Sequence, residues 1–348
     1  MLRVIIKAIN DCIYRLFLWL KNNHYFKTEV RYGMVNNMKN QQEYWSDYWR
    51  NDGKHGEVFV NSEGKKPDYI REFWRVNLHP VIEAAQGSAN VVLDLACGAG
   101  SIFEDLEQSN YDQVQLIASD ISQSALDIVS TRVPEAKVVC CSCTDLPFED
   151  GTINTIVSQF GIEYAGIDAF KEAANKLAND GQLVFLSHYK NGYIDQRNQR
   201  FLEGAKLAID SGFIDAAMSL VDATYSSSPS KLRQAKDNFK VAEKPLANSF
   251  KTNPEGIHNH LYFGFRQLYL KHQSYTKSDI EGWLQSMRAD IKKSIIKVSE
   301  ICKVSLNDDD INQVRNTLSE AKLNDIDIST LCIPNTQDVI AWVIKASK

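Results

Sequence analysis

The 348-residue sequence lacks an uninterrupted apolar run of membrane-spanning length, and it lacks a surplus of positive charge. Its first 20 residues are rich in apolar side chains, but Lys7, Asp11 and Arg15 interrupt them and no small-residue cleavage site follows. This pattern argues against a spanning helix and against a secretory signal. Lysine and arginine total 39 against 44 acidic residues, a net charge of −5. Because phosphate binding needs clustered basic residues, we expect no nucleic-acid partner. We also expect the protein to be cytoplasmic.

The sequence also lacks a disulfide framework and a complete metal-binding motif. Its seven cysteines are odd in number and show no framework spacing, which predicts reduced thiols in the cytosol. Cys140, Cys141 and Cys143 cluster, but no second ligand pair follows at zinc-site spacing. His258 and His260 alternate and could contribute two ligands, with no third ligand evident. We therefore predict no metal site.

Residues 1–39 are predicted to form an N-terminal extension that contains an amphipathic helix. Its apolar residues recur on one helical face: Ile5, Ile6, Ile9, Ile13, Leu16, Phe17 and Leu20. Three interpretations stay open. The helix packs on the body of the protein, it lies on a membrane surface, or the native start is Met34 or Met38. We favour packing or a later start over membrane contact.

Residues 40–88 are predicted to form a helical cap before the first strand. Two groups of apolar and aromatic residues have helical spacing: Tyr44, Trp45, Tyr48 and Trp49, then Ile70, Phe73, Trp74 and Leu78. The second helix is expected to end near Pro80, because proline interrupts the hydrogen bonding of a helix. Core packing explains most of these side chains, and a segment in this position can also cover a cofactor.

Between residues 89 and 190, apolar segments alternate with helix-compatible ones. Strands are expected at 91–95, 114–120, 137–141, 152–158 and 182–187, and helices at 101–108, 124–132 and 169–177. A turn is expected at 179–181. This alternation is typical of a parallel sheet with helices on both faces.

Residues 191–322 are polar and poor in strand signals, and we predict a helical insertion or lid. Helices are expected at 202–209, 216–220, 261–270, 280–296 and 311–318, with a serine-rich loop at 226–230. Strands at 328–333 and 339–344 would complete the sheet within residues 323–348. A helical lid suits a small substrate, and the rival interpretation is a dimer interface.

Small and acidic residues gather where the predicted strands end. Asp94 opens a turn in which Ala96, Gly98 and Gly100 leave room for a ligand to approach the backbone. Asp120 ends the second strand, where a carboxylate can accept both hydroxyls of a ribose. Both features would also suit NAD.

A dinucleotide fits the remaining residues less well. Phe103 stands where the dinucleotide fingerprint has its third small residue. Asp94 would lie unfavourably beside a pyrophosphate, whereas it suits a cationic or amine-bearing ligand. Asp145 follows the third strand and can accept the exocyclic amine of an adenine lying on Leu146.

The segment from Asp94 to Gly100 resembles motif I of the class I S-adenosylmethionine-dependent methyltransferases. Asp120 is similar to the ribose-binding acid of that family, and residues 145–148 to its adenine-binding segment. Residues 158–161 are similar to the segment that runs beside the methionine part of the cofactor and the substrate. Residues 179–183 are similar to the family's turn into strand five. Residues 339–344 are similar to its final antiparallel strand.

Three positions depart from the family pattern, and none of them removes a cofactor contact by residue type. Ala96 stands where many relatives have glycine, and Asn154 replaces an acid often found in strand four. The turn at 179–181 lacks the usual proline.

The resemblance implies a Rossmann-like, seven-stranded, mostly parallel α/β sheet and S-adenosyl-L-methionine as the cofactor. The residues it assigns to the cofactor are Asp94, Ala96, Gly98, Gly100, Asp120, Ile121, Asp145, Leu146 and Gln159. It implies methyl transfer by in-line displacement, in which alignment of the reactants and exclusion of water are the main tasks.

His188 and Glu163 are the candidate catalytic residues. His188 follows the fifth strand, at the edge where open α/β sheets bind substrates, and an imidazole can take up a proton near neutral pH. Glu163 and Tyr164 follow the fourth strand and could meet the substrate or the cofactor amine. A histidine bonded to a loop and a solvated surface acid are the simpler interpretations.

We expect a small-molecule acceptor. Two other classes of function stay open, an NAD-binding oxidoreductase and a non-catalytic cofactor-binding or scaffold protein, and so does a homodimer. The absence of an Asn-Pro-Pro-Tyr-type tetrad after strand four argues against a nucleic-acid methyltransferase.

Overall fold

The computed structural model describes residues 38–51, 53, 66–84, 90–104, 114–226, 228–254 and 256–348. Nearly all of the predicted N-terminal extension, with Cys12 and the alternative start Met34, lies outside these residues. The chain divides into two compact units. The core unit lies within residues 35–199 and 299–348, and the helical unit includes residues 200–298. The finer domain limits expected from the sequence stay predictions.

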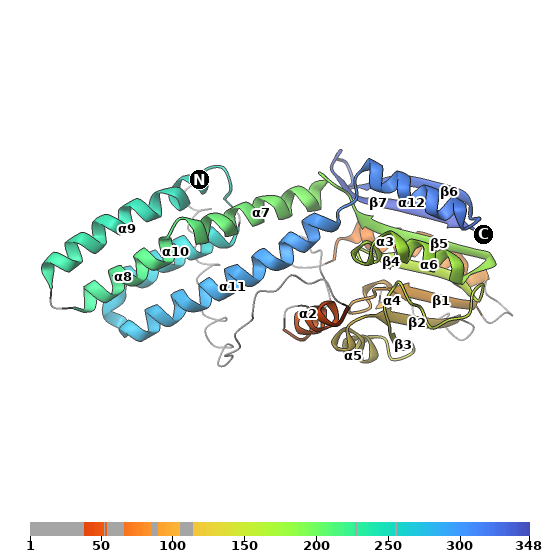
Figure 1. Ribbon diagram of the computed structural model, residues 1–348, viewed down its shortest axis with the longest axis horizontal. Coiled ribbons are helices and arrows are strands. Elements are labelled where there is room, and N and C mark those ends of the chain that lie inside the picture. Colours follow the sequence, from red (N-terminus) through yellow and green to blue (C-terminus); the bar gives the residue numbers. More distant parts are fainter. Residues whose placement is uncertain are drawn as a thin grey trace. The chain divides into compact units, whose positions relative to one another are not determined.

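The core unit is built on a sheet of seven strands in the order β3-β2-β1-β4-β5-β7-β6 (Figure 1). The strands are β1(Asn90–Leu95), β2(Val114–Asp120), β3(Lys137–Cys140), β4(Ile153–Gln159), β5(Leu177–His188), β6(Asn324–Cys332) and β7(Val339–Ser347). The first five pair in parallel, and β7 runs antiparallel to both β5 and β6. This arrangement confirms the predicted fold class. The strand order reverses between β1 and β4, the position where open α/β sheets bind ligands.

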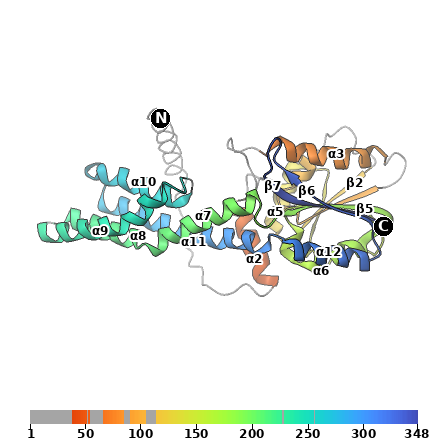
Figure 2. The same ribbon diagram turned by 90° about the horizontal axis from the view of Figure 1, so that it is seen from above.

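Alternate side chains of the strands face two separate layers of helices. Val92 packs with α3(Asp68–Ala84), α4(Ser101–Glu104) and α5(Gln123–Arg132) on one face. Leu93 packs with α6(Ile167–Lys176) and α12(Asp308–Glu320) on the other. Figure 2 shows α3 on one side of the sheet and α6 with α12 on the opposite side. Burial on both faces explains why these strands are nearly continuous apolar runs.

The helix expected to end near Pro80 instead continues to Ala84, so that prediction was wrong. Pro80 is exposed, whereas Leu78 and Ile82 on either side of it are buried against the sheet. Packing of this apolar face outweighs the hydrogen bond that proline cannot donate.

The turn expected at 179–181 was also placed wrongly, because these residues lie within β5. The pairing of β5 with β4 shifts between Leu177 and Gln182, which face Ile153 and Thr155. The additional residues are accommodated as an irregularity in the strand, which takes the place of a separate turn.

The helical unit contains α8(Phe213–Tyr225), α9(Pro229–Ser249) and α10(Ile257–Leu270), with most of α7(Tyr193–Asp210) and α11(Lys277–Val304). A short 3-10 turn, η4(His272–Ser274), precedes α11. Phe213, Phe239 and Phe265 form its centre, with ring centroids 5.1 to 5.7 Å apart. No helix in the described part of the chain is long and apolar enough to cross a membrane.

The helix α9 was not predicted, and its 21 residues begin inside the serine-rich loop expected at 226–230. Pro229 occupies the start of the helix, where the amide that proline lacks has no intrahelical partner anyway. Only Ala235, Phe239 and Leu246 of this helix are buried. That narrow apolar stripe is too sparse for periodicity alone to reveal.

Candidate active site

The loop after β1 turns sharply at three residues with left-handed backbone. Ala96, Gly98 and Gly100 have φ values of 50°, 53° and 78°. This conformation costs glycine little, whereas Ala96 holds it under strain of a kind that clusters at functional sites. A Cβ on Gly161, which follows β4, would lie 2.8 Å from the Ala96 carbonyl oxygen, so the two loops approach closely. The predicted glycine turn is therefore present and tightly packed.

Asp120 ends β2 and is fixed against this turn. Its Oδ2 accepts from the Gly98 backbone N–H at 2.9 Å, and its Oδ1 accepts from the Ser122 N–H at 2.8 Å. Burial raises the pKa of Asp120 to about 6, and the two backbone hydrogen bonds oppose that rise. The carboxylate is held at the end of the strand where a ribose-binding acid was predicted.

Asp94 lies beside Asp120 and lacks any hydrogen-bond partner. The side chain is buried, and neither carboxylate oxygen has a donor. Burial and the nearby Asp120 raise the pKa of Asp94 well above its usual range, and Lys66 opposes this effect. A buried carboxylate without donors calls for an explanation, and a cationic amine would supply both charge and hydrogen bonds. The residues present thus fit a ligand that carries an ammonium group.

Lys66, which lies just before α3, was not among the residues predicted to form the site. It is buried, and its ammonium donates to the Ser101 carbonyl oxygen at 2.8 Å. No motif or periodicity marks it, since its place beside the glycine loop depends on how α3 packs.

The helix α2(Met38–Asn51) lies beside α5 (Figure 1), and its Trp49 packs over the glycine loop. The Trp49 ring lies 2.4 Å from the position that a Cβ on Gly98 would take, and it also contacts Ala99 and Ala125. Arg50 donates to Ser124 Oγ at 3.5 Å. Only glycine at position 98 leaves room for this ring.

The residues predicted to bind adenine lie in different environments. Asp145 is exposed, whereas Leu146 is buried in the core and its N–H donates to Glu172 Oε1 at 3.1 Å. Ile121 is half-buried, and its carbonyl oxygen accepts from Cys140 Sγ at 3.6 Å. The adenine contacts of these residues stay predictions.

Gln159, at the end of β4, uses both ends of its amide within the protein. Its Oε1 accepts from Trp74 Nε1 at 2.5 Å, and its Nε2 donates to Ser101 Oγ at 3.2 Å. These bonds join β4 to α3 and α4 at the site. Its predicted cofactor contact stays a prediction. Both polar atoms of its side-chain amide are engaged in hydrogen bonds within the protein.

Glu163 and His188 meet at the ends of β4 and β5. Glu163 belongs to the short helix η3(Ile162–Ala165), and its Oε1 lies 2.7 Å from His188 Nδ1 and accepts from the His188 backbone N–H at 2.9 Å. Both side chains are buried, at 0% and 3% exposure. Two residues 25 positions apart in sequence thus form one carboxylate–histidine pair.

His258 and His260 of the helical unit do not form a comparable pair. His258 Nε2 lies 3.2 Å from Ser249 Oγ, and His260 packs near Trp283. Burial lowers the pKa of both histidines. Within the ranges that the structure describes, no group of three or more His, Cys, Asp or Glu side chains could hold a metal ion.

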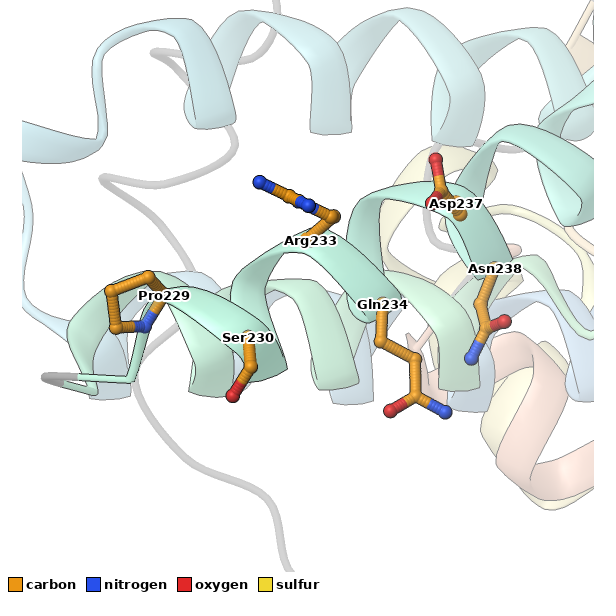
Figure 3. A pocket seen from close by; sticks show the side chains of 6 residues that line it. All are labelled: Pro229, Ser230, Arg233, Gln234, Asp237 and Asn238. Carbon is orange, nitrogen blue, oxygen red and sulfur yellow. The ribbon is translucent and has the colours of Figure 1, made fainter.

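A shallow hollow in the helical unit carries no comparable chemistry. Its six lining residues all belong to the first half of α9, and Figure 3 shows their side chains spread along that one helix. They are Pro229, Ser230, Arg233, Gln234, Asp237 and Asn238. The acidic strand ends of the core unit are therefore the better candidate site.

Comparison with known proteins found a family match within the core unit. Residues 92–181 match the family model of a methyltransferase domain. A Mycobacterium tuberculosis protein named "Probable S-adenosylmethionine-dependent methyltransferase" is 29% identical over 174 residues, which cover 46% of this chain and 62% of the relative. Over these residues the chain is similar to S-adenosylmethionine-dependent methyltransferases. The family resemblance inferred from the sequence is thereby confirmed.

Two further relatives share parts of the chain. A ubiquinone/menaquinone biosynthesis C-methyltransferase of Citrifermentans bemidjiense is 25% identical over 104 residues, 27% of this chain and 44% of that protein. The alignments thus span less than two thirds of either curated relative. A solved structure of magnesium protoporphyrin IX methyltransferase from Synechocystis is 17% identical, covers 44% of this chain and 72% of that chain, and has a TM-score of 0.33.

Proposed function

We propose that this protein transfers a methyl group from S-adenosylmethionine to a small-molecule acceptor. The observation that carries the proposal is the buried, unpartnered carboxylate of Asp94 beside Asp120. The donor carries a sulfonium and an ammonium, so two acids and a glycine turn suit it. One relative is named for ubiquinone/menaquinone biosynthesis, which supports a small acceptor.

The residues that would hold the donor follow from the site. Asp120 would accept the ribose hydroxyls, Asp94 would accept the ammonium, and the backbone around Ala96, Gly98 and Gly100 would lie against the donor. When bound, the donor supplies a methyl group on a sulfonium, which is already a good leaving group. Ile121, Asp145 and Leu146 are proposed for the adenine by family resemblance.

His188 is proposed as the general base, with Glu163 as its partner. A carboxylate on Nδ1 favours the tautomer that carries its proton there, which leaves Nε2 free to accept a proton from the acceptor. Glu163 Oε1 lies 2.7 Å from His188 Nδ1, within hydrogen-bond reach. Burial of both groups keeps water from competing for this contact.

An NAD-binding oxidoreductase is supported less well. A pyrophosphate is anionic, and it would lie near the carboxylates of Asp94 and Asp120 at the same strand ends. A non-catalytic cofactor-binding protein would share the donor site and lack turnover. The cytoplasmic location, a homodimer and the absence of a nucleic-acid partner stay predictions.

Calorimetric titration with S-adenosylmethionine tests the proposal. We expect binding to the full chain, loss of binding in Asp120→Ala, and no heat from NADH. Failure of S-adenosylmethionine to bind the folded protein would overturn the proposal, and binding of NADH would favour the oxidoreductase.

A further inference from the structure

This inference rests on the proposed function and names its substrate class. We infer that the acceptor is an amine, which the aromatic and acidic side chains around His188 recognise in its cationic form. Three features of the core unit support it: the rings near His188, the sign of the charges beside them, and the carboxylate–histidine pair.

An aromatic cluster extends from α2 to His188. It consists of Tyr44, Trp45, Tyr48, Phe160 and Tyr164. Trp45 meets the Tyr164 ring edge to face at 5.1 Å between centroids, and the Tyr164 and Phe160 rings lie 6.1 and 4.7 Å from the His188 ring. Aromatic faces attract cations, and substituted ammonium groups are recognised by such rings.

The cluster combines elements that are far apart in sequence. Trp45 comes from α2 and Tyr164 from η3, and both residues are half-buried. Phe160 has φ of 53°, a left-handed conformation that is uncommon for a bulky residue. Strain of this kind is retained where neighbouring structure requires it, and it places the Phe160 ring against His188.

The charges beside the cluster are negative. The pKa of Tyr164 is raised well above its usual range, first by burial and then by Glu163, Tyr44, Tyr48 and Glu300. Glu163 is buried, while Glu300 is half-buried and holds Lys303 at 2.7 Å. Such surroundings stabilise a cation and oppose an anion.

The negative charge near His188 distinguishes between acceptors that react as anions and acceptors that bind as cations. A phenol or carboxylic acid reacts as an anion, which Glu163 and Glu300 would disfavour. An amine arrives as a cation, and the nitrogen becomes cationic again once it has accepted the methyl group. The rings and acids around His188 favour both charged forms.

The proposed step balances as follows. The ammonium first gives a proton to His188 Nε2, which leaves a neutral nitrogen with a lone pair. That lone pair forms the new N–C bond while the C–S bond of the donor breaks and its electron pair stays on sulfur. Glu163 stabilises the imidazolium through Nδ1, as a carboxylate does in other carboxylate–histidine pairs.

A binding experiment tests the acceptor class without knowledge of the natural acceptor. The full chain, saturated with S-adenosylhomocysteine, is titrated with choline and with dimethylbutanol, its uncharged carbon isostere, and followed by tryptophan fluorescence and calorimetry. We expect choline to bind about 10-fold or more tightly than the isostere, as a desolvated cation–π contact predicts. Trp45→Leu should abolish this preference.

Two further variants separate charge from folding. Glu163→Gln keeps an acceptor for His188 Nδ1 and removes the negative charge, so choline binding should weaken while binding of S-adenosylhomocysteine persists. Phe73→Leu is the matched control, since this half-buried ring lies on α3 and already faces Lys345 Nζ at 5.9 Å. It should leave the preference for choline unchanged.

The outcomes separate the two proposals. Equal binding of choline and its isostere, or binding of neither, overturns the amine inference provided that S-adenosylhomocysteine binds. A preference that survives Trp45→Leu also overturns it, because the cation would then bind elsewhere. If S-adenosylhomocysteine itself does not bind the folded wild type, the result overturns the proposed function, and the amine inference that rests on it is overturned as well.

Discussion

Buried polar groups differ in kind between the two units. In the core unit they include Asp94, Asp120 and Glu163, all acids at strand ends. Among the described residues of the helical unit, the buried side-chain atoms without partners are neutral, namely His258 Nδ1, Asn259 Oδ1 and Trp283 Nε1. Burying a charge costs far more than burying a neutral polar group, so a buried acid with an oxygen that lacks a donor, such as Asp94 or Glu163, points to a ligand or reaction that uses it. The comparison therefore locates function in the core unit and packing in the helical unit.

The sharpest test sets two buried acids of the core unit against each other. Asp94 has no donors, whereas Asp195 accepts from the Asn191 N–H and from the Gln199 and Ser305 side chains, and lies 3.7 Å from Lys190. We expect Asp94→Asn to weaken S-adenosylmethionine binding by about 100-fold with little loss of stability, because the variant cannot pair with an ammonium. Calorimetry measures the affinity and thermal unfolding measures the stability.

Asp195→Asn should give the opposite pattern. It leaves donors without acceptors and should lower the free energy of unfolding by about 2–3 kcal/mol while donor binding persists. Because burial keeps the pKa of Asp94 high, binding to the wild type should also release a proton, seen as a dependence of the binding enthalpy on buffer ionisation. Loss of donor affinity in both variants alike would contradict this account of Asp94.

The second test uses the opposite pH dependence of the two units. The folded pKa of Asp120 is about 6, above its ordinary value of 3.8, so the folded state binds the proton more tightly. Its contribution to stability is present below about pH 4 and is lost as the pH rises to about 6, a change of about 2–3 kcal/mol. Asp120→Asn should reduce this slope in denaturant unfolding, leaving the part that Asp94 contributes.

His258 in the helical unit should act in the other direction. Burial lowers its pKa, so its contribution to stability is present above its ordinary pKa of 6.5 and is lost as the pH falls. His258→Gln should therefore flatten the acid side of the profile and leave the Asp120 slope intact. Identical slopes in the wild type and Asp120→Asn would show that Asp120 is not the group responsible.

The third test concerns the packing of α2 on the glycine loop. An alanine Cβ at position 98 would lie 2.4 Å from the Trp49 ring, on backbone with φ of 53°. We expect Gly98→Ala to lower the unfolding free energy by about 2 kcal/mol and to weaken donor binding. Gly212→Ala is the matched control, because its φ is 69° and a Cβ there meets nothing within 4 Å. Equal losses in both variants would assign the cost to backbone strain alone.

The smallest effect is expected within α11 of the helical unit. A Cβ on Gly282 would meet nothing within 4 Å, and this glycine lies inside a helix. Gly282→Ala should raise the unfolding free energy by about 0.5–1 kcal/mol, the usual difference in helix propensity, and leave donor binding unchanged. A change in the affinity for the methyl donor would contradict the assignment of donor binding to the core unit alone.

Sequence periodicity was sufficient for the sheet and for the positions of the acids. The second strand was predicted as 114–120 and is observed as Val114–Asp120, because buried parallel strands are short apolar runs ended by turn residues. Periodicity failed for α9, whose apolar stripe is sparse, and for α3, where packing of Leu78 and Ile82 overrides Pro80. Local signals could not anticipate either outcome.

The sequence was enough to name candidate site residues one by one, but it indicated little of how they are arranged. The sequence identified Asp94, Glu163 and His188 as candidates, but the contact between Glu163 and His188 depends on how the ends of β4 and β5 meet. The position of Trp49 on Gly98 depends likewise on the packing of α2. Contacts between distant segments follow from topology and packing, which a single sequence does not display.

A crystal structure of the complex with S-adenosylhomocysteine tests the central claim most directly. The account predicts the ligand at the carboxyl ends of β1 and β2, with its ribose hydroxyls on Asp120 and its ammonium within hydrogen-bond distance of Asp94. A ligand bound elsewhere, or one that leaves the Asp94 carboxylate without a donor, would contradict it.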